Sequence, residues 1–129
     1  MPEKSVIRTE AAPVPFQGAP YNQAIVAGGL VFTAGQLGVR PDGGGLAGET
    51  IQEQTEQVFA NLAAILEAAG SSLDRLVKTT VFLQRLGDFG GMNDVYASHV
   101  GAQPPARSTV EVAKLPSGAL VEIEAIALI

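Results

Sequence analysis

The segment Pro104–Glu124, PPARSTVEVAKLPSGALVEIE, decides the fold of this chain. It contains most of two strand-like stretches, Ala106–Ala113 and Leu120–Leu128, which are joined by a short turn rich in proline and glycine. Both stretches are largely apolar, yet they carry Arg107 and Glu122. Moving a charge out of water is costly unless the charge is paired or used. Together with Glu124, these two side chains are therefore the first candidates for chemistry.

Alternation along the last strand places its carboxylates on one face. Residues of a strand point in turn to opposite faces of the sheet, so Glu122 and Glu124 share a face with Leu120, Ile126 and Leu128. Taken alone, each charge has a simpler interpretation, with the glutamates at the solvent and Arg107 in a structural ion pair. Together they suit hydrolysis of a small amphoteric acid, because a guanidinium binds a carboxylate with two hydrogen bonds and a carboxylate activates water.

The first half of the chain predicts the start of a sheet. A short strand at Ser5–Thr9 precedes a proline-rich loop at 11–20. Strands are predicted at Ala24–Ala27 and Leu30–Gln36, joined by a tight hairpin at Gly28-Gly29. The following glycine-rich connector, 38–48, predicts a flexible loop. A phosphate-binding loop is the disfavoured alternative, since no Gly-Lys-Ser/Thr follows.

Two helices and another strand follow this connector. An apolar stripe of helical period begins after Thr50, and Thr50 with Glu53 predicts a capping box. Gly70 is expected to end this helix, and the nearly continuous apolar run Leu76–Leu83 is expected to form a strand. Asp88 is predicted to cap a second, shorter helix that extends to about residue 100.

This order of elements predicts a single α/β (α+β) domain over residues 1–129, built on a mixed sheet with both helices packed on one face. The strands are too apolar for their second face to remain in water. We therefore expect a homo-oligomer in which sheets pack against one another.

Composition limits the classes of partner. A net charge of −5 and no cluster of basic residues argue against nucleic acid. No apolar run is long enough to cross a bilayer, and the N-terminal segment lacks the apolar core of a signal peptide, so a cytoplasmic location is expected. One histidine, His99, and no cysteine make a transition-metal site unfavourable, and His99 is interpreted as a structural or surface residue.

The chain also resembles a known family over nearly its whole length. The resemblance rests on PARS (105–108), VEVA (110–113), Leu115-Pro116 and VEIEAIA (121–127), with further likeness at APY (19–21), TAGQ (33–36), EAAG (67–70) and VKTTVF (77–82). These motifs are similar to the signature of the RidA (YjgF-type) enamine/imine deaminases.

This resemblance implies a chorismate-mutase-like fold and a homotrimer whose sheets form an inner barrel, with three sites between subunits. It also implies that the last strand is inserted centrally, although the short link after Ala113 could equally close a hairpin. Members hydrolyse 2-iminobutanoate, 2-iminopropanoate and 2-aminoacrylate, reactive products of pyridoxal-phosphate enzymes, to 2-oxoacids and ammonia. The activity needs neither a cofactor nor a metal.

Matching motifs assign roles to residues of this chain. By resemblance, Arg107 holds the substrate carboxylate and Glu122 activates the attacking water. The other expected contacts are a pocket wall from Tyr21, the Gly35 backbone N–H, the backbone of Thr109, and Asn93, which shapes the cleft.

Three positions depart from the common family pattern: Ala34 stands where a serine is usual, Thr109 where cysteine or serine is common, and Asn22 where serine is frequent. Two other functions stay open. One is a non-catalytic trimer that binds small acids or acts like a chaperone. The other is an RNA-cleaving translation inhibitor, which the acidic balance disfavours.

Overall fold

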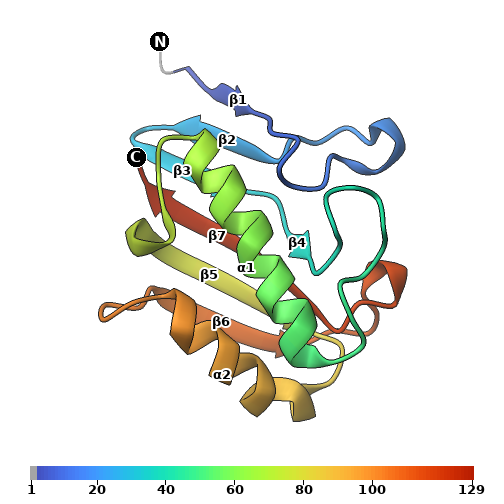
Figure 1. Ribbon diagram of the computed structural model, residues 1–129. Coiled ribbons are helices and arrows are strands. Elements are labelled where there is room, and N and C mark those ends of the chain that lie inside the picture. Colours follow the sequence, from blue (N-terminus) through green and yellow to red (C-terminus); the bar gives the residue numbers. More distant parts are fainter. Residues whose placement is uncertain (1–2) are drawn as a thin grey trace.

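The computed structural model describes residues 3–129, and the first two residues of the predicted 1–129 domain lie outside this range. The chain forms one sheet and two helices, and Figure 1 shows how they are arranged. The strands are β1 (Ser5–Ile7), β2 (Ala24–Ala27), β3 (Leu30–Thr33), β4 (Gln36–Leu37), β5 (Leu76–Leu83), β6 (Ala106–Glu111) and β7 (Val121–Leu128). The helices are α1 (Ile51–Ala68) and α2 (Phe89–His99), and four short 3-10 turns complete the elements.

The sheet is mixed, with the last strand at its centre. Its order is β1-β2-β3-β7-β5-β6, and β4 pairs with β7 beyond the end of β3. Only the pair β5 and β6 is parallel, as a connection through α2 requires, and the other named pairs are antiparallel. The central insertion of β7 is confirmed, so β6 and β7 do not form a hairpin.

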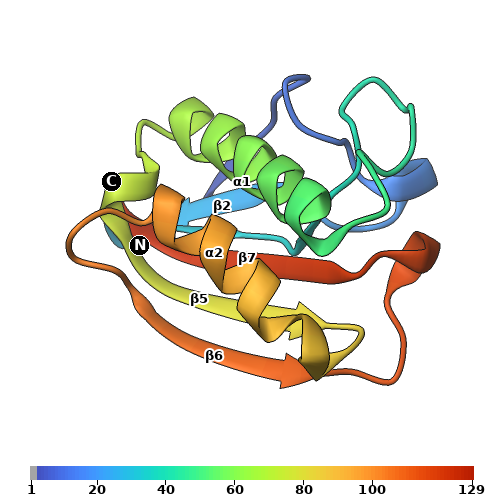
Figure 2. The same cartoon turned by 60° about the horizontal axis from the view of Figure 1, so that its bottom comes forward.

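Both helices lie on the same face of this sheet, as Figure 2 shows. The side chains of β7 that point toward them, Val121, Ile123, Ala125 and Ala127, are buried. They meet the apolar stripe of α1, in which Val58, Phe59, Leu62, Ile65 and Leu66 have no exposed surface. The predicted α+β architecture and the predicted alternation of β7 are therefore confirmed.

The sequence predicted the N-cap of α1 correctly but not that of α2. Thr50 and Glu53 form the expected capping box, with the Thr50 Oγ1 accepting the Glu53 N–H at 3.1 Å. The Asp88 cap is wrong, because its side chain makes no capping hydrogen bond. A 3-10 turn over Leu86–Asp88 leads directly into α2 and gives Asp88 φ −83° and ψ 2°, whereas an N-cap needs an extended residue.

The predicted strand Leu30–Gln36 is interrupted. Phe32 pairs with Ile126, but Gln36 pairs with Ile123, so four steps along this segment match three steps along β7. The extra residue is a β-bulge, and the Thr33 hydroxyl accepts the Ala125 N–H at 3.0 Å within it. The bulge separates β3 from β4 and reverses the faces to which the later residues point. At the other end of the sheet, β6 ends at Glu111, two residues before the predicted Ala113.

The sheet face away from the helices is apolar and partly exposed. Phe32, Val110 and Leu128 are 40%, 44% and 51% exposed. Phe32 pairs with the half-buried Ile126, and Val110 lies across β5 from Glu122. Such a surface is typical of one that meets another protein. Within residues 3–129, neither helix has the length and apolarity that a bilayer crossing would need.

Candidate active site

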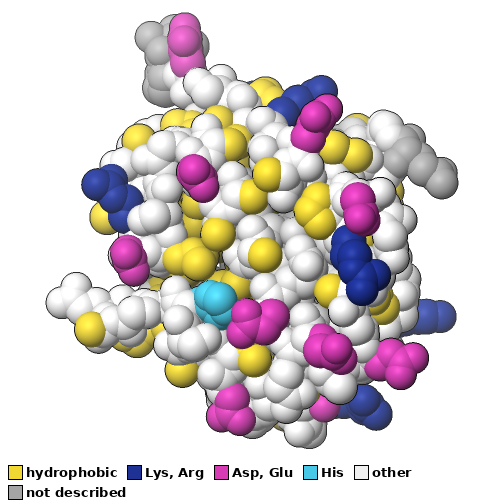
Figure 3. All heavy atoms as spheres, viewed as in Figure 1, with side chains coloured by type: hydrophobic (Ala, Val, Ile, Leu, Met, Phe, Trp, Pro, Cys, Tyr) yellow, Lys and Arg dark blue, Asp and Glu magenta, His cyan; other side chains and the backbone are white. Residues whose placement is uncertain are grey.

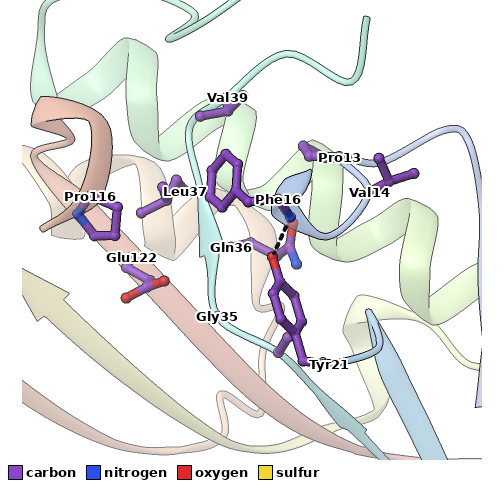
Figure 4. A pocket seen from close by; sticks show the side chains of 11 residues that line it. Pro13, Val14, Phe16, Tyr21, Gly35, Gln36, Leu37, Val39, Pro116 and Glu122 are labelled. Carbon is purple, nitrogen blue, oxygen red and sulfur yellow. Dashed lines mark hydrogen bonds between the residues drawn. The ribbon is translucent and has the colours of Figure 1, made fainter. Parts of the chain in front are cut away.

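A hollow of about 370 Å³ opens beside Glu122 (Figure 4). It lies at one end of the sheet face that points away from the helices, which we call the open face. Glu122 lies on β7 opposite Leu37 of β4 and Phe82 of β5. Its carboxylate is the acidic group of a mainly apolar wall formed by Pro13, Val14, Phe16, Leu37, Val39 and Pro116. Partial burial raises the pKa of Glu122 and the nearby charge of Glu124 adds to this, since both disfavour the ionised form. A carboxylate in this setting is a stronger proton acceptor than one in water.

Gly35 makes room for this carboxylate. A Cβ atom at position 35 would lie 2.7 Å from Glu122 Oε2 and 2.8 Å from its Cδ. Any larger residue would displace the side chain of Glu122. The bulge described above carries Gly35 to this position, because it turns the backbone between β3 and β4 across β7.

The proline-rich loop closes the hollow from the N-terminal side. Figure 4 shows Tyr21 rising toward Phe16, whose backbone N–H donates to the Tyr21 hydroxyl at 3.2 Å. Gln23 fixes the base of this loop and is 2% exposed. Its side chain accepts the Thr9 N–H and donates to the carbonyls of Thr9, Ala12 and Pro13. The loop is therefore tied to the sheet although it has little regular structure.

A second hollow, of about 390 Å³, contains Arg107 between β6 and α2. Asn93, Tyr96, Val100 and Pro105 are among its other lining residues. The Arg107 guanidinium carbon lies 4.6 Å from the centroid of the Tyr96 ring and 5.3 Å from that of Phe89. Arg107 forms no ion pair with any of residues 3–129, so its donors are available to a ligand.

Comparison with known proteins identifies the family. The family model described as Endoribonuclease L-PSP matches residues 9–129. A RutC family protein of Pyrococcus horikoshii is 51% identical over 124 residues, which cover 96% of this chain and 97% of the relative. The chloroplastic Reactive Intermediate Deaminase A of Arabidopsis thaliana is 46% identical over 97% of this chain and 66% of its own length. The crystal structure of Escherichia coli TdcF with bound serine has a TM-score of 0.88 and 40% identity, covering 97% of this chain and 98% of TdcF.

This chain belongs to the RidA (YjgF-type) family. Its mixed sheet with two helices on one face is the chorismate-mutase-like fold of that family.

The RidA-family residues predicted for the site fall into two groups within one chain. Tyr21, Gly35 and Glu122 line the first hollow, whereas Asn93 and Arg107 line the second. The two hollows open on opposite faces of the sheet. Arg107 is the register partner of buried Thr79 and points toward α2, while Glu122 points to the open face. A single chain therefore does not bring the guanidinium and the carboxylate together.

The remaining predicted contacts are less direct. Thr109 lies two residues after Arg107 on the same side of β6 and is half-buried, but among the described residues it is not one of those lining the Arg107 hollow. Ala34, which replaces the usual serine of the RidA family, lines the Glu122 hollow beside Gly35. A methyl group thus faces the hollow where a hydroxyl is common.

Tyr96 makes a contact that the sequence does not reveal. It is buried on the inner side of α2, but its ring also faces the Arg107 guanidinium. No signal in the sequence separates these roles, because an aromatic residue on the inner side of a helix predicts packing in either case.

His99 is structural, in agreement with the sequence interpretation. Its ring stacks on Phe59 at 4.7 Å, and its Nε2 lies 3.1 Å from a carboxylate oxygen of Glu56, which joins α2 to α1. Figure 3 shows acidic side chains spread over this helix-bearing face among a few basic ones. Residues 3–129 contain no group of three or more His, Asp or Glu side chains arranged to hold a metal ion.

Proposed function

We propose that this protein hydrolyses small 2-imino acids, such as 2-iminobutanoate and 2-iminopropanoate, and their enamine forms to 2-oxoacids and ammonia. We further propose that it does so in sites assembled between the subunits of a homotrimer. The observation that carries the proposal is that one chain holds two incomplete half-sites: on one face an arginine that forms no ion pair with any of residues 3–129, and on the other a half-buried glutamate. The arginine offers a cation for a substrate carboxylate, and the glutamate offers a proton acceptor.

Two copies of the chain can join these half-sites. Arg107 lies on β6, the edge strand, and Glu122 lies on the open apolar face. If the edge of one subunit packs on the open face of the next, Arg107 of the first approaches Glu122 of the second. Such a head-to-tail contact closes into a ring when the rotation between subunits permits. The same contact covers Phe32, Val110 and Leu128, which supports the trimer with an inner barrel implied by the family.

The chemistry follows from the two groups. The imine carbon is already electrophilic, so the protein needs to fix the substrate, supply water and move protons. Arg107 binds the substrate carboxylate through two parallel N–H donors. Glu122 accepts a proton from water as the water oxygen bonds to the imine carbon. It then returns this proton to the nitrogen to give the amino alcohol. Glu122 next moves the proton of the new hydroxyl to the same nitrogen, so that the C–N bond breaks and releases ammonia and the 2-oxoacid.

Relatives support this choice of substrate class. One is named a reactive intermediate deaminase, and TdcF was crystallised with serine, a small amphoteric acid of the kind that the two half-sites would hold. The family model carries the name of an endoribonuclease. A net charge of −5 and the scattered basic residues do not favour binding of a phosphate backbone.

Generating 2-iminobutanoate in situ with an amino-acid oxidase or dehydratase tests the activity. Faster decay of the intermediate in the presence of the protein is expected, and Arg107→Ala and Glu122→Gln should each abolish the acceleration while the protein stays folded. Tight binding of a 2-oxoacid without faster decay would instead identify a non-catalytic binder. RNA cleavage that survives rigorous removal of contaminating nucleases would favour the RNA-cleaving translation inhibitor.

Mixing the two inactive variants tests the shared site. If each site takes Arg107 from one subunit and Glu122 from its neighbour, reassembled equimolar Arg107→Ala and Glu122→Gln subunits contain intact sites at about one quarter of the interfaces. About one quarter of the wild-type activity should return. If both residues served a site within one subunit, no activity would return.

A further inference from the structure

Tyr96 lies against both Arg107 and the strand next to it. Thr79 of β5 and Arg107 of β6 are register partners, so their side chains stand side by side and point toward α2. Tyr96 of α2 covers both of them. Its hydroxyl oxygen lies 2.6 Å from Thr79 Oγ1, and its ring centroid lies 4.6 Å from the Arg107 guanidinium carbon.

The orientation of the Tyr96 ring is fixed from several sides. Thr79 is fully buried, so its hydroxyl has the Tyr96 hydroxyl as a partner in place of water. Phe59 of α1 contacts Tyr96 edge to face, with ring centroids 5.4 Å apart and an interplanar angle of 79°. Tyr96 itself is only 5% exposed. The face that it presents to Arg107 is therefore rigid.

Phe89 adds a second aromatic ring near the guanidinium. Its centroid lies 5.3 Å from the guanidinium carbon, and it sits at the first turn of α2, where it is partly exposed. Arg107 forms no ion pair with any of residues 3–129. The contacts that orient its plane are thus aromatic faces, which attract the cation without occupying its N–H donors.

We propose that Tyr96, held by the Thr79 hydroxyl, is a positioning residue that sets the plane of the Arg107 guanidinium for a substrate carboxylate, with Phe89 as a weaker second support. This inference rests on the proposed function, in which Arg107 binds that carboxylate. An acidic partner would also orient the guanidinium, but it would compete with the substrate for the same donors. An aromatic support lowers the conformational cost of binding and leaves the donors free.

Binding of 2-oxobutanoate, measured by titration calorimetry, and the KM and kcat for in situ 2-iminobutanoate test the proposal. Tyr96→Leu should weaken binding by about 3- to 30-fold, the range that a cation–π contact provides. KM should rise by the same factor and kcat should change little, as for a contact made equally in ground and transition states. Tyr96→Phe keeps the ring and should restore binding to within about threefold of wild type.

Two further variants control for folding. Val95→Ala truncates a buried residue of the same helix that is not among those lining the Arg107 hollow, and it should lower stability without changing the affinity for 2-oxobutanoate. Phe89→Leu changes a partly exposed residue, so it should fold even if Tyr96→Leu does not, and it should weaken binding by about two- to fourfold.

Wild-type affinity in a folded Tyr96→Leu protein would overturn the proposal, as would wild-type affinity in Phe89→Leu if Tyr96→Leu cannot be obtained folded. Arg107→Ala separates this failure from failure of the proposed function. If Arg107→Ala loses 2-oxobutanoate binding while Tyr96→Leu keeps it, only the positioning role is wrong. If Arg107→Ala binds normally, the carboxylate role of Arg107 is wrong as well.

Discussion

Replacing Gly35 with alanine should separate the position of Glu122 from the stability of the fold. The new methyl carbon would lie 2.7 Å from Glu122 Oε2 and 2.8 Å from its Cδ, whereas ordinary contacts begin near 3.4 Å. The carboxylate must therefore retreat by about 0.7 Å. A misplacement of about 1 Å can cost about 100-fold in rate, so we expect kcat/KM to fall by about 10- to 100-fold, or about 1.4–2.7 kcal/mol.

Stability should change little, because the atoms that must yield belong to the end of a flexible side chain. We expect the free energy of unfolding of Gly35→Ala to stay within about 1 kcal/mol of wild type. Gly38→Ala is the matched control. Its Cβ would lie 2.6 Å from the Gln54 carbonyl oxygen and 2.8 Å from the Gln54 Cα, which are backbone atoms of α1 and cannot retreat alone. This variant should lose about 1–3 kcal/mol.

Imine decay assays and urea unfolding of both variants provide the measurement. The backbone N–H at position 35 is kept in Gly35→Ala, so any loss of activity comes from the added methyl group. A folded Gly35→Ala protein with wild-type kcat/KM would refute the view that the carboxylate needs this position. Equal destabilisation of Gly35→Ala and Gly38→Ala would show that the Glu122 side chain does not yield.

Three other changes test single contacts. Burial and the charge of Glu124 raise the pKa of Glu122, so the folded protein binds the carboxyl proton of Glu122 more tightly than the unfolded chain does. Glu122→Gln should therefore be more stable than wild type at pH 7, and urea unfolding should show that this difference vanishes below about pH 4. Gln23→Leu removes four hydrogen bonds from the base of the proline-rich loop, so it should lower the free energy of unfolding by about 2–4 kcal/mol and also lower the rate of imine decay. A loss of stability below about 1 kcal/mol would show that water replaces these bonds. Thr50→Ala removes the N-cap of α1 and should lower the free energy of unfolding by about 1 kcal/mol. Thr50 is not among the residues that line the Glu122 or the Arg107 hollow, so imine decay should be unchanged, and a change in activity would contradict this assignment.

Local patterns predicted most of the fold. The Gly28-Gly29 turn has both residues at positive φ, as the tight hairpin requires, and the capping box at Thr50 starts α1 where expected. Both features depend on neighbours in the sequence. The central position of β7 came instead from the family resemblance, since strand order depends on contacts between distant segments.

The errors lie where tertiary contacts override local preference. The run Leu30–Gln36 is apolar and β-prone throughout, but the register of β7 imposes a bulge within it. Asp88 is a favourable cap by type, but the preceding 3-10 turn removes the extended conformation that a cap needs.

Sequence and resemblance proposed candidate site residues but could not assign them to faces of the sheet. Whether Arg107 points toward the helices or away from them depends on the pairing of β6 with β5, which no alternation within β6 reveals. The crowding of Gly35 by Glu122 is equally hidden, because 87 positions separate them along the chain. Their proximity depends on the pairing of β4 with β7.

The bulge between β3 and β4 has a consequence for how this chain can change in length. Deleting one residue at 33–35 would make three steps along this segment match three along β7, so Gln36 and Leu37 would keep their partners but the bulge that carries Gly35 to Glu122 would be lost. Several residues added to the exposed tip of the 38–48 connector would leave this bulge untouched. Evolutionary gaps should therefore be common in the connector and rare in the three residues that precede β4.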